Sequence, residues 1–566
     1  MAAVDAPKDT NSATRTHPTL TQGTLIAAAL GVCIAQVGLA IPAVLNGLFQ
    51  EDLGTTSSQL TWISDAFLVP VTLLELTFGV LGDLFGRKRL LVGGALLLAL
   101  GELIAVLTPG AGTSTGTRVL VLWIGQIVAG IGAAALFPTT LAMVAAGTHT
   151  TGHRARSITL WAAALSAGGF ISPVLGGLVT KLSFGSDEHA SWRWAFLAVL
   201  VLALVSAGVS LVLAEDSASP AGRSLDWSGQ ITIAVALFAL LFAVIQGPTS
   251  GWGSAEVIGG FIVAAVFLVL FVIAENRSEA PLLRLDLFKN RAFAIAALVT
   301  VFGMFSFLGT AYATSIRLSA IQGFSPLKTS IAFVLLNGLA LLLMPVTSRL
   351  LERYNPKWAL SGGAALIGVG DLWMATISAS NRSIPAITIP LILIGAGFGL
   401  AVAAVTAVAV NTVPNHLAGM ASGSTSMLRD FGFTLGPAVI GAIALSRAAN
   451  DIHAKIDSNP TLKQALATFN ASPSHVPAAE KASVQGAVEA VNSGPLGANG
   501  VPSTVVVDGK TVPFNPLHNV AFHALDNAYS VGYVVCGVVA LIAAALALTA
   551  LPGGAHETLM DAESLD

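Results

Sequence analysis

Gly79-Val80-Leu81-Gly82-Asp83-Leu84-Phe85-Gly86-Arg87-Lys88-Arg89 is the stretch of sequence that separates two long apolar segments. Residues 69–81 carry a single charge, Glu75, and residues 90–100 carry none. A chain that leaves a membrane between these segments must turn tightly and expose one acid and three bases. Glycine permits such a turn and a close approach of helices, and clustered Arg and Lys keep a loop on the cytoplasmic side. The stretch therefore predicts a short cytoplasmic loop between two membrane-spanning helices.

The composition of the chain excludes most soluble classes of protein. Hydrophobic residues make up 54% of the 566 residues and charged residues only 10%, against about 25% charged residues in soluble domains. The net charge of −3 does not indicate a class of partner, and the sequence has no basic tract that would argue for nucleic acid. The sequence has no phosphate-binding loop, nucleophile elbow or metal-ligand motif. We therefore expect neither an enzyme nor an ATP-driven pump, and no cofactor or metal.

Fourteen apolar stretches approach or exceed the roughly 20 residues that a membrane-spanning helix needs. Basic residues gather in the even-numbered loops, which places these loops and both termini in the cytoplasm by the positive-inside rule. The sequence thus predicts an all-α polytopic membrane protein. The expected spans are 24–49, 60–82, 90–108, 119–147, 157–182, 194–214, 229–247, 255–274, 292–318, 327–348, 358–377, 385–410, 418–446 and 528–551.

The fifth and thirteenth spans carry matching glycine–proline segments and are eight spans apart, a spacing that fits two six-helix bundles with two extra central helices between them. The expected parts are a tail at 1–23, a bundle at 24–214, a linker with the extra spans at 215–291, a bundle at 292–551 and a tail at 552–566.

The second bundle includes a long polar loop at 447–527, which this topology places outside. The loop is either a flexible tether or a small ordered cap. Residues 504–512 predict a β-hairpin, because Asp508-Gly509 suits a two-residue turn between valines. Segments 451–470 and 476–492 are candidate short helices.

Two proline-containing segments repeat between the fifth and thirteenth spans. They are Gly168-Gly-Phe-Ile-Ser-Pro173-Val-Leu-Gly176-Gly177 and Gly432-Phe-Thr-Leu-Gly-Pro437-Ala-Val-Ile-Gly441, with glycines at matching distances from the proline. Transporters are often built from repeated halves. Proline bends a helix and glycine permits close crossing. We expect these residues to lie in helices that rock during transport.

Both motifs resemble those of the major facilitator superfamily. The stretch Gly79–Arg89 is similar to the loop between its helices 2 and 3, and Gly168–Gly177 resembles its antiporter signature, with Ser172 replacing one glycine. With fourteen spans, the chain resembles the fourteen-helix drug:proton antiporters, including the quaternary-ammonium exporters, over about residues 20–552. The resemblance implies the major facilitator fold, the proton gradient as energy source, small lipophilic or amphipathic substrates, a plasma or inner membrane location and a monomer.

Ionisable residues inside the predicted spans are the candidate proton and substrate sites, because charge is costly there. Asp65, in Trp62-Ile63-Ser64-Asp65, resembles an acid of the quaternary-ammonium exporters, and Asp430 matches a second family acid. Loss of water favours the protonated form of an acid, so a proton and a cation can compete for one carboxylate. The secondary candidates are Glu75, Asp371 and Glu102.

Each acid also has a structural interpretation. Asp65 is alternatively an interfacial acid in contact with water, and Glu102 a packing or lipid-facing residue. Asp430 is alternatively paired with another helix. We expect no contact between Asp430 and Arg429, because adjacent helical residues point about 100° apart.

Spans 1 and 4 depart from the family pattern, at Cys33 and Ala35 and at Gln126 and Ala129. Cys33 stands where the family carries an acid in span 1, and Gln126 stands where it carries an arginine in span 4. An amide forms hydrogen bonds but holds no charge. We therefore expect a proton-driven exporter of lipophilic, cationic drugs, coupled through Asp65, Glu75 or Asp430. The alternatives are an exporter or facilitator of an amphipathic lipid or native metabolite with weak proton coupling, and a non-transporting sensor or scaffold, which the intact loop disfavours.

Overall fold

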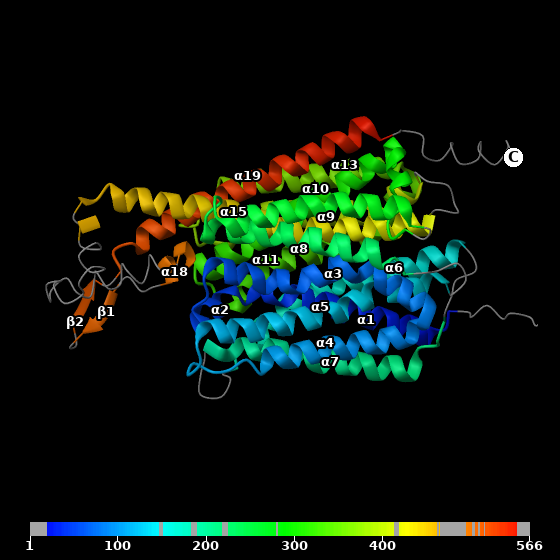
Figure 1. Ribbon diagram of the computed structural model, residues 1–566, viewed down its shortest axis with the longest axis horizontal. Coiled ribbons are helices and arrows are strands. Elements are labelled where there is room, and N and C mark those ends of the chain that lie inside the picture. Colours follow the sequence, from blue (N-terminus) through cyan, green and yellow to red (C-terminus); the bar gives the residue numbers. More distant parts are fainter. Residues whose placement is uncertain are drawn as a thin grey trace, which may run out of the picture.

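The computed structural model shows a bundle of long helices that run roughly parallel to one another (Figure 1). It describes residues 20–146, 151–182, 189–217, 225–278, 281–411, 418–460, 463–464, 494–500, 504–507, 510–513 and 515–551.

The first half of the chain forms six long helices and three short elements. The long helices are α1 (Gln22–Ala40), α3 (Ser57–Phe85), α4 (Arg87–Val106), α5 (Thr115–Ala146), α6 (Thr151–Val179) and α7 (Trp192–Leu213). The short elements are η1 (Ile41–Val44), α2 (Asn46–Leu53) and η2 (His189–Ser191).

The second half repeats the six-helix plan. It contains α10 (Arg291–Ile316), α11 (Pro326–Phe333) continued through η5 (Val334–Gly338) into α12 (Leu339–Arg353), α13 (Pro356–Ala375), α14 (Ile384–Asn411), α15 (Ala418–Asp457) and α19 (His518–Ala550). The short helices η3 (Leu285–Lys289) and η4 (Arg317–Ile321) flank α10. Two further helices, α8 (Trp227–Ser250) and α9 (Ala255–Arg277), connect the halves.

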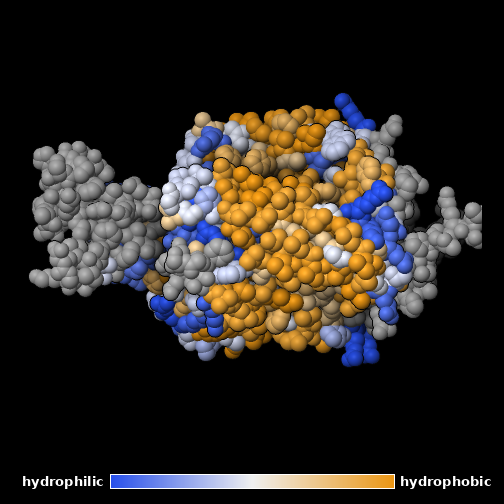
Figure 2. Space-filling model, turned by 90° about the horizontal axis from the view of Figure 1, so that it is seen from below, coloured by the Kyte–Doolittle hydropathy of each residue, from blue (hydrophilic) through white to orange (hydrophobic). Residues whose placement is uncertain are grey.

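The described residues include thirteen helices that are long and apolar enough to cross a membrane. The remaining predicted span, 358–377, is present as α13, which packs against α14 and α19 and contains the ionisable residues Lys357 and Asp371. On the face shown in Figure 2, apolar residues cover the middle of the molecule and hydrophilic residues gather toward both ends. The prediction of an all-helical, membrane-spanning fold is confirmed.

The predicted loop between spans 2 and 3 is a turn at one residue, Gly86. Helix α3 ends at Phe85 and α4 begins at Arg87, while Gly86 has a φ of +101°. A residue with a Cβ would be strained at this φ, and its Cβ would lie 2.9 Å from the carboxylate of Asp216. We call the end of the molecule that holds Gly86 the motif end.

The opposite end, which we call the cap end, carries α18 (Gly494–Gly500), β1 (Thr504–Val507) and β2 (Lys510–Pro513). The two strands pair antiparallel, with Val506 opposite Thr511. Residues 451–457 continue α15, so they do not begin a separate short helix as predicted. The predicted turn residues Asp508 and Gly509 and the candidate helix 476–492 lie outside the described residues.

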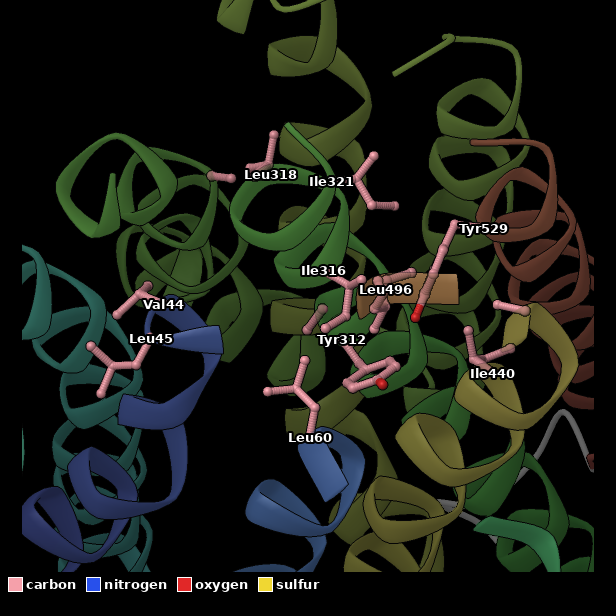
Figure 3. Packing of buried hydrophobic residues seen from close by; sticks show 14 of the residues in the cluster. Val44, Leu45, Leu60, Tyr312, Ile316, Leu318, Ile321, Ile440, Leu496 and Tyr529 are labelled. Atoms are coloured by element: carbon pink, nitrogen blue, oxygen red, sulfur yellow. The ribbon is translucent and has the colours of Figure 1, made fainter. Parts of the chain in front are cut away.

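Contacts between the two halves gather at the cap end. The Asn46 amide donates to Ser315 Oγ at 2.7 Å, and the Thr61 and Tyr312 hydroxyls are 2.8 Å apart. Leu496 of α18 is fully buried in the same apolar cluster as Leu60, and Figure 3 shows both beside Tyr312. The halves are therefore held together at the cap end.

Helix α8 lies along the seam between the two halves. It packs against α3 of the first half and α15 of the second, while α9 packs mainly on α8 (Figure 1). Apolar residues spaced by four, Ile233, Leu237 and Leu241, face this seam together with Ile245. This spacing places them on one face of a helix, which explains how α8 fills the seam.

Candidate functional site

Arg429 joins two acids at the seam between the halves. Its Nε lies 2.8 Å from Asp430 Oδ1 and its Nη2 lies 3.8 Å from Glu75 Oε1. The side chains are nearly buried, with 14% of Arg429 and 6% of each acid exposed. We call these three residues the seam triad. It contains one guanidinium and two carboxyl groups, so one bound proton makes it neutral.

The contact between Arg429 and Asp430 corrects the sequence-based expectation. Adjacent Cβ atoms do point in different directions on a helix, but the long arginine side chain reaches back around the helix. Its Nη2 also lies 3.1 Å from Asp430 Oδ2, which gives the pair two parallel hydrogen bonds. Such a paired geometry is typical of strong arginine–carboxylate contacts.

Hydroxyl groups hold α3 and α15 together beside the seam triad. Thr72 Oγ1 lies 2.7 Å from Thr434 Oγ1 and donates to the Asp430 carbonyl at 3.1 Å. All three residues are at most 4% exposed. The triad is thus held at a tight helix crossing, and a movement between the halves must alter it.

Gln230 of α8 holds the other side of α3. Its Nε2 donates to the Leu73 carbonyl at 2.5 Å, and its Oε1 accepts from the Thr77 hydroxyl. These two contacts flank Glu75, which lies between Leu73 and Thr77 in the sequence. Gln230 therefore fixes the part of α3 that presents Glu75 to Arg429.

Asp65 lies apart from the seam triad, closer to the cap end. It is 0% exposed and neither carboxylate oxygen has a hydrogen-bond partner among the described residues. It lies one helical turn from Thr61, whose hydroxyl contacts that of Tyr312 in the second half. The alternative of an interfacial acid in contact with water is therefore wrong in this structure.

The remaining predicted acids lie inside their own bundles. Asp371 accepts a hydrogen bond of 2.6 Å from Thr310 Oγ1, between α13 and α10. Glu102 is fully buried and faces α1 beside Gly38, so it does not face lipid. Gln126 is also fully buried, and none of the four side-chain oxygen and nitrogen atoms of Glu102 and Gln126 has a hydrogen-bond partner in the described part of the chain.

The loop motif forms contacts at the motif end. Arg87 Nη2 lies 2.7 Å from Asp83 Oδ1, one helical turn earlier. The backbone N–H of Arg87 donates to the Ser217 carbonyl at 2.9 Å, and that of Lys88 donates to Asp216 Oδ1 at 3.2 Å. The motif therefore binds the segment that follows α7. Arg89 is exposed, and the Cα of Gly79 faces Pro138 of α5.

The two repeated glycine–proline segments pack in matching ways. A Cβ added to Gly168 would lie 2.3 Å from the Cys33 carbonyl of α1, and one at Gly432 would lie 2.7 Å from the Val301 carbonyl of α10. Each segment thus packs closely on the first helix of its own half. Gly176 also faces α1, through Val44 of the adjoining η1.

Both repeated segments also face the other half. A Cβ added to Gly177 would lie 2.6 Å from Leu327 Cα on α11, and one at Gly441 would lie 3.3 Å from Thr61 Oγ1 on α3. The prolines, Pro173 and Pro437, lie inside α6 and α15. The repeat that the sequence shows is therefore a repeat of packing partners.

Gln230 and Arg429 are the site residues that sequence reasoning did not assign. The sequence could have identified Gln230, because an amide side chain inside a membrane-spanning helix needs a hydrogen-bond partner, just as a charged side chain does there. Arg429 lies in a predicted span, but the expected separation of adjacent helical side chains left it without an assigned role. Within the described residues, no group of three or more His, Cys, Asp or Glu residues is placed to hold a metal ion.

Comparisons with known proteins agree with this architecture. A family model described as Major Facilitator Superfamily matches residues 26–437. The multidrug resistance protein Stp of Mycobacterium tuberculosis is 31% identical over 422 residues, which cover 74% of this chain and 75% of that protein. The tetracenomycin C resistance and export protein of Streptomyces glaucescens is 27% identical over 527 residues, covering 93% and 90%.

Solved structures show the same fold. The xylose transporter XylE from E. coli, solved in an inward open conformation, has a TM-score of 0.57 and 13% sequence identity, and the match covers 96% of this chain and 98% of that chain. At this identity the likeness concerns the fold alone.

Proposed function

Since the chain belongs to the major facilitator superfamily, we propose that it exports lipophilic, cationic drugs in exchange for protons. Relatives named for multidrug resistance and for tetracenomycin C export support drug export. The observation that carries proton exchange is the seam triad, where Glu75 and Asp430 share the Arg429 guanidinium between the two halves.

The charges of the seam triad suit competition between a proton and a cation. With both carboxyl groups ionised the triad carries one net negative charge, which attracts a cation in a medium of low dielectric. One bound proton removes that charge and the attraction. Glu75 belongs to α3, and its partners belong to α15. A proton that binds to Glu75 therefore weakens the ion pair with Arg429, which connects the two halves. Proton binding would thereby favour a relative movement of the halves, as alternating access requires.

The packing that is repeated in the two halves supplies the contacts that would move during transport. We assign the rocking contacts to the repeated segments around Pro173 and Pro437, and the control of the motif end to Asp83, Arg87 and their neighbours. Asp65 and Asp371 are further proton or substrate sites, and Glu102 and Gln126 are secondary ones.

The distribution of basic residues supports an orientation with the motif end and both termini in the cytoplasm. The cap end would then face outwards, and the structure would correspond to a state closed on the outside. We propose a monomer in the plasma or inner membrane.

Reconstituted vesicles give a direct test of this function. With a pH-sensitive dye inside, addition of a lipophilic cation such as ethidium should dissipate an imposed pH gradient. The variant Glu75→Gln, Asp430→Asn should lose this response and should bind the cation more weakly, because only the positive charge of Arg429 remains in the triad. A wild-type protein that moves several cations without moving protons would refute proton exchange.

Gln126 and Cys33 favour a second candidate function. They occupy positions where the resemblance leads us to expect an arginine and an acid, and Gln126 is buried without a partner among the described residues. This supports an exporter or facilitator of an amphipathic lipid or native metabolite with weak proton coupling. Transfer of a fluorescent phospholipid between vesicle leaflets, without proton flux, would favour this candidate.

A further inference from the structure

Three of the four tyrosines of this chain lie buried in one place. Tyr312 is on α10, and Tyr529 and Tyr533 are one turn apart on α19; their exposed fractions are 5%, 1% and 0%. The fourth, Tyr354, ends α12 and is 61% exposed. Figure 3 shows Tyr312 and Tyr529 side by side among aliphatic residues.

The hydroxyl groups of these tyrosines form a series. The Tyr312 hydroxyl lies 2.8 Å from Thr61 Oγ1 of α3, and the Tyr529 hydroxyl is its neighbour on the other side. Tyr529 and Tyr533 are at positions i and i+4, so they share one face of α19. The Tyr533 hydroxyl lies 3.0 Å from Thr314 Oγ1 of α10. We call Tyr312, Tyr529 and Tyr533 the tyrosine series.

Buried acids lie at the two ends of the tyrosine series. Asp65 lies one helical turn from Thr61 on α3, and the Thr61 hydroxyl contacts that of Tyr312. Asp371 accepts a hydrogen bond from Thr310 of α10, one turn from Thr314, whose hydroxyl contacts that of Tyr533. Both acids are 0% exposed and both have at least one oxygen without a partner among the described residues. The other ionisable groups that face Tyr533 are Arg317 and Cys536.

The surroundings make a purely structural role costly. The series is enclosed by Leu60, Ile316, Ile440 and Leu496. Burying a hydroxyl group without a hydrogen bond costs about 1–3 kcal/mol in proteins, and phenylalanine would fill the same space without that cost. The hydroxyl of Tyr529 has no hydrogen-bond partner of good geometry in the described part of the chain. Its position is explained if that hydroxyl takes part in function.

We propose that the tyrosine series is a proton relay that connects Asp65 and Asp371. A hydroxyl group both donates and accepts a hydrogen bond. Each tyrosine can therefore pass its own proton to the next group while it receives one from the group before. One acid loses a proton, the other carboxylate gains it, and no tyrosine becomes ionised. Groups that lie close without a direct hydrogen bond, such as Tyr529 and Tyr533, need a small side-chain movement for each transfer.

The relay connects the two halves of the molecule. Asp65 and Thr61 belong to the first half, and the rest of the path, from Tyr312 to Asp371, belongs to the second. The contact between Thr61 and Tyr312 is present because the cap end is closed. When the halves separate there, the relay breaks, and a proton that has reached one acid stays on it. The inference rests on the proposed proton exchange and adds to the seam triad a path between two further acids, Asp65 and Asp371.

Tyrosine-to-phenylalanine variants test the relay, because each removes one oxygen atom and keeps the ring. We expect Tyr312→Phe, Tyr529→Phe and Tyr533→Phe to lower ethidium-driven proton flux in vesicles by about 100-fold or more, the lower end of the range for loss of a proton-transfer group. The matched control is Tyr354→Phe, which should behave as wild type. Binding of ethidium, followed by its fluorescence on the purified protein, should change less than about twofold.

The outcomes separate the relay from its alternatives. Three buried phenylalanine variants with the proton flux of Tyr354→Phe would overturn it. Equal losses of flux and of ethidium binding would also overturn it, because they would assign the tyrosines to substrate binding. Unfolding temperatures of the variants in detergent, equal to wild type or higher, would exclude misfolding as the cause. Absence of ethidium-driven flux in wild type would instead refute the proposed function itself.

Discussion

The guanidinium of Arg429 on α15 lies 3.8 Å from the carboxylate of Glu75 on α3, which forms an ion pair between the two halves of the molecule at a buried helix crossing. A buried ion pair does not by itself indicate added stability or a function, because the cost of removing both charges from water offsets their attraction. The second carboxyl group, Asp430, adds a negative charge that Arg429 alone cannot neutralise. The triad therefore becomes neutral when it binds one proton, whereas an isolated pair of one arginine and one carboxylate is neutral without it.

Replacement of Glu75 by glutamine should abolish the dependence of export on the pH gradient. The remaining Arg429–Asp430 pair is neutral when Asp430 is ionised, so a further proton would create a buried net positive charge. We expect ethidium export from vesicles at a pH gradient of zero and at an outside-acid gradient to become equal within about twofold. The matched control is Glu256→Gln, at an exposed position of α9. A variant with the full gradient dependence would show that the seam triad is not the coupling site.

Replacement of Gln230 by leucine should loosen α8 from α3. Leucine keeps most of the volume but removes both hydrogen bonds, to the Leu73 carbonyl and the Thr77 hydroxyl. Each hydrogen bond in a membrane protein contributes roughly 0.6–2 kcal/mol. We expect a lower unfolding temperature in detergent and slower export.

Thr232→Val serves as the control for Gln230, because the Thr232 hydroxyl bonds to carbonyls of its own helix, at Ser228 and Gly229. Equal unfolding temperatures for the two variants would show that α8 is held by its apolar contacts alone.

Replacement of Asp52 by asparagine should destabilise the cap end of the first bundle. Its carboxylate lies 2.6 Å from Arg118 Nη2 and 3.3 Å from Arg193 Nη1, and it accepts from Trp192 Nε1 at 2.7 Å. The side chain is 3% exposed. Loss of one partner of a buried ion pair costs about 3–5 kcal/mol. Thermal unfolding in detergent should show this loss, whereas Asp451→Asn, at an exposed position of α15, should have no effect.

Replacement of Gly177 by alanine should weaken closure at the cap end. The added Cβ would lie 2.6 Å from Leu327 Cα of the other half, so the two helices must move apart. Overpacking of this kind costs about 1–3 kcal/mol. In a variant without Cys33 and Cys536, we expect a cysteine at Asn46 to react faster with a membrane-impermeant maleimide.

Gly208→Ala is the matched control for Gly177, because no heavy atom lies within 4 Å of the added Cβ. It gains the same helix propensity, about 1 kcal/mol. Labelling at Asn46 that is equally fast in both variants would remove Gly177 from the closing contact.

The sequence by itself determined the class of fold. Apolar stretches of about 20 residues can cross a membrane only as helices, because lipid offers no partner for backbone groups, and the spans, the turn at Gly86 and the repeat around Pro173 and Pro437 followed from local patterns. The same patterns placed four ionisable residues inside membrane-spanning segments, where a charge is costly and a functional role is expected: Asp65, Glu75, Asp371 and Asp430.

Only the tertiary structure decided which of these residues meet. Glu75 and Arg429 are more than 350 residues apart in the sequence. The packing of α8 against α3 and α15 cannot be predicted from the local sequence of any one of these helices. The angle between adjacent helical residues also gave the wrong expectation for Arg429 and Asp430, because it does not include the length of the arginine side chain. The hydrophobic pattern sets the period of each helix, but the rotation of one helix against another depends on the shapes of many side chains together. The pairing of acids, arginine and tyrosines is therefore a property of the assembled bundle.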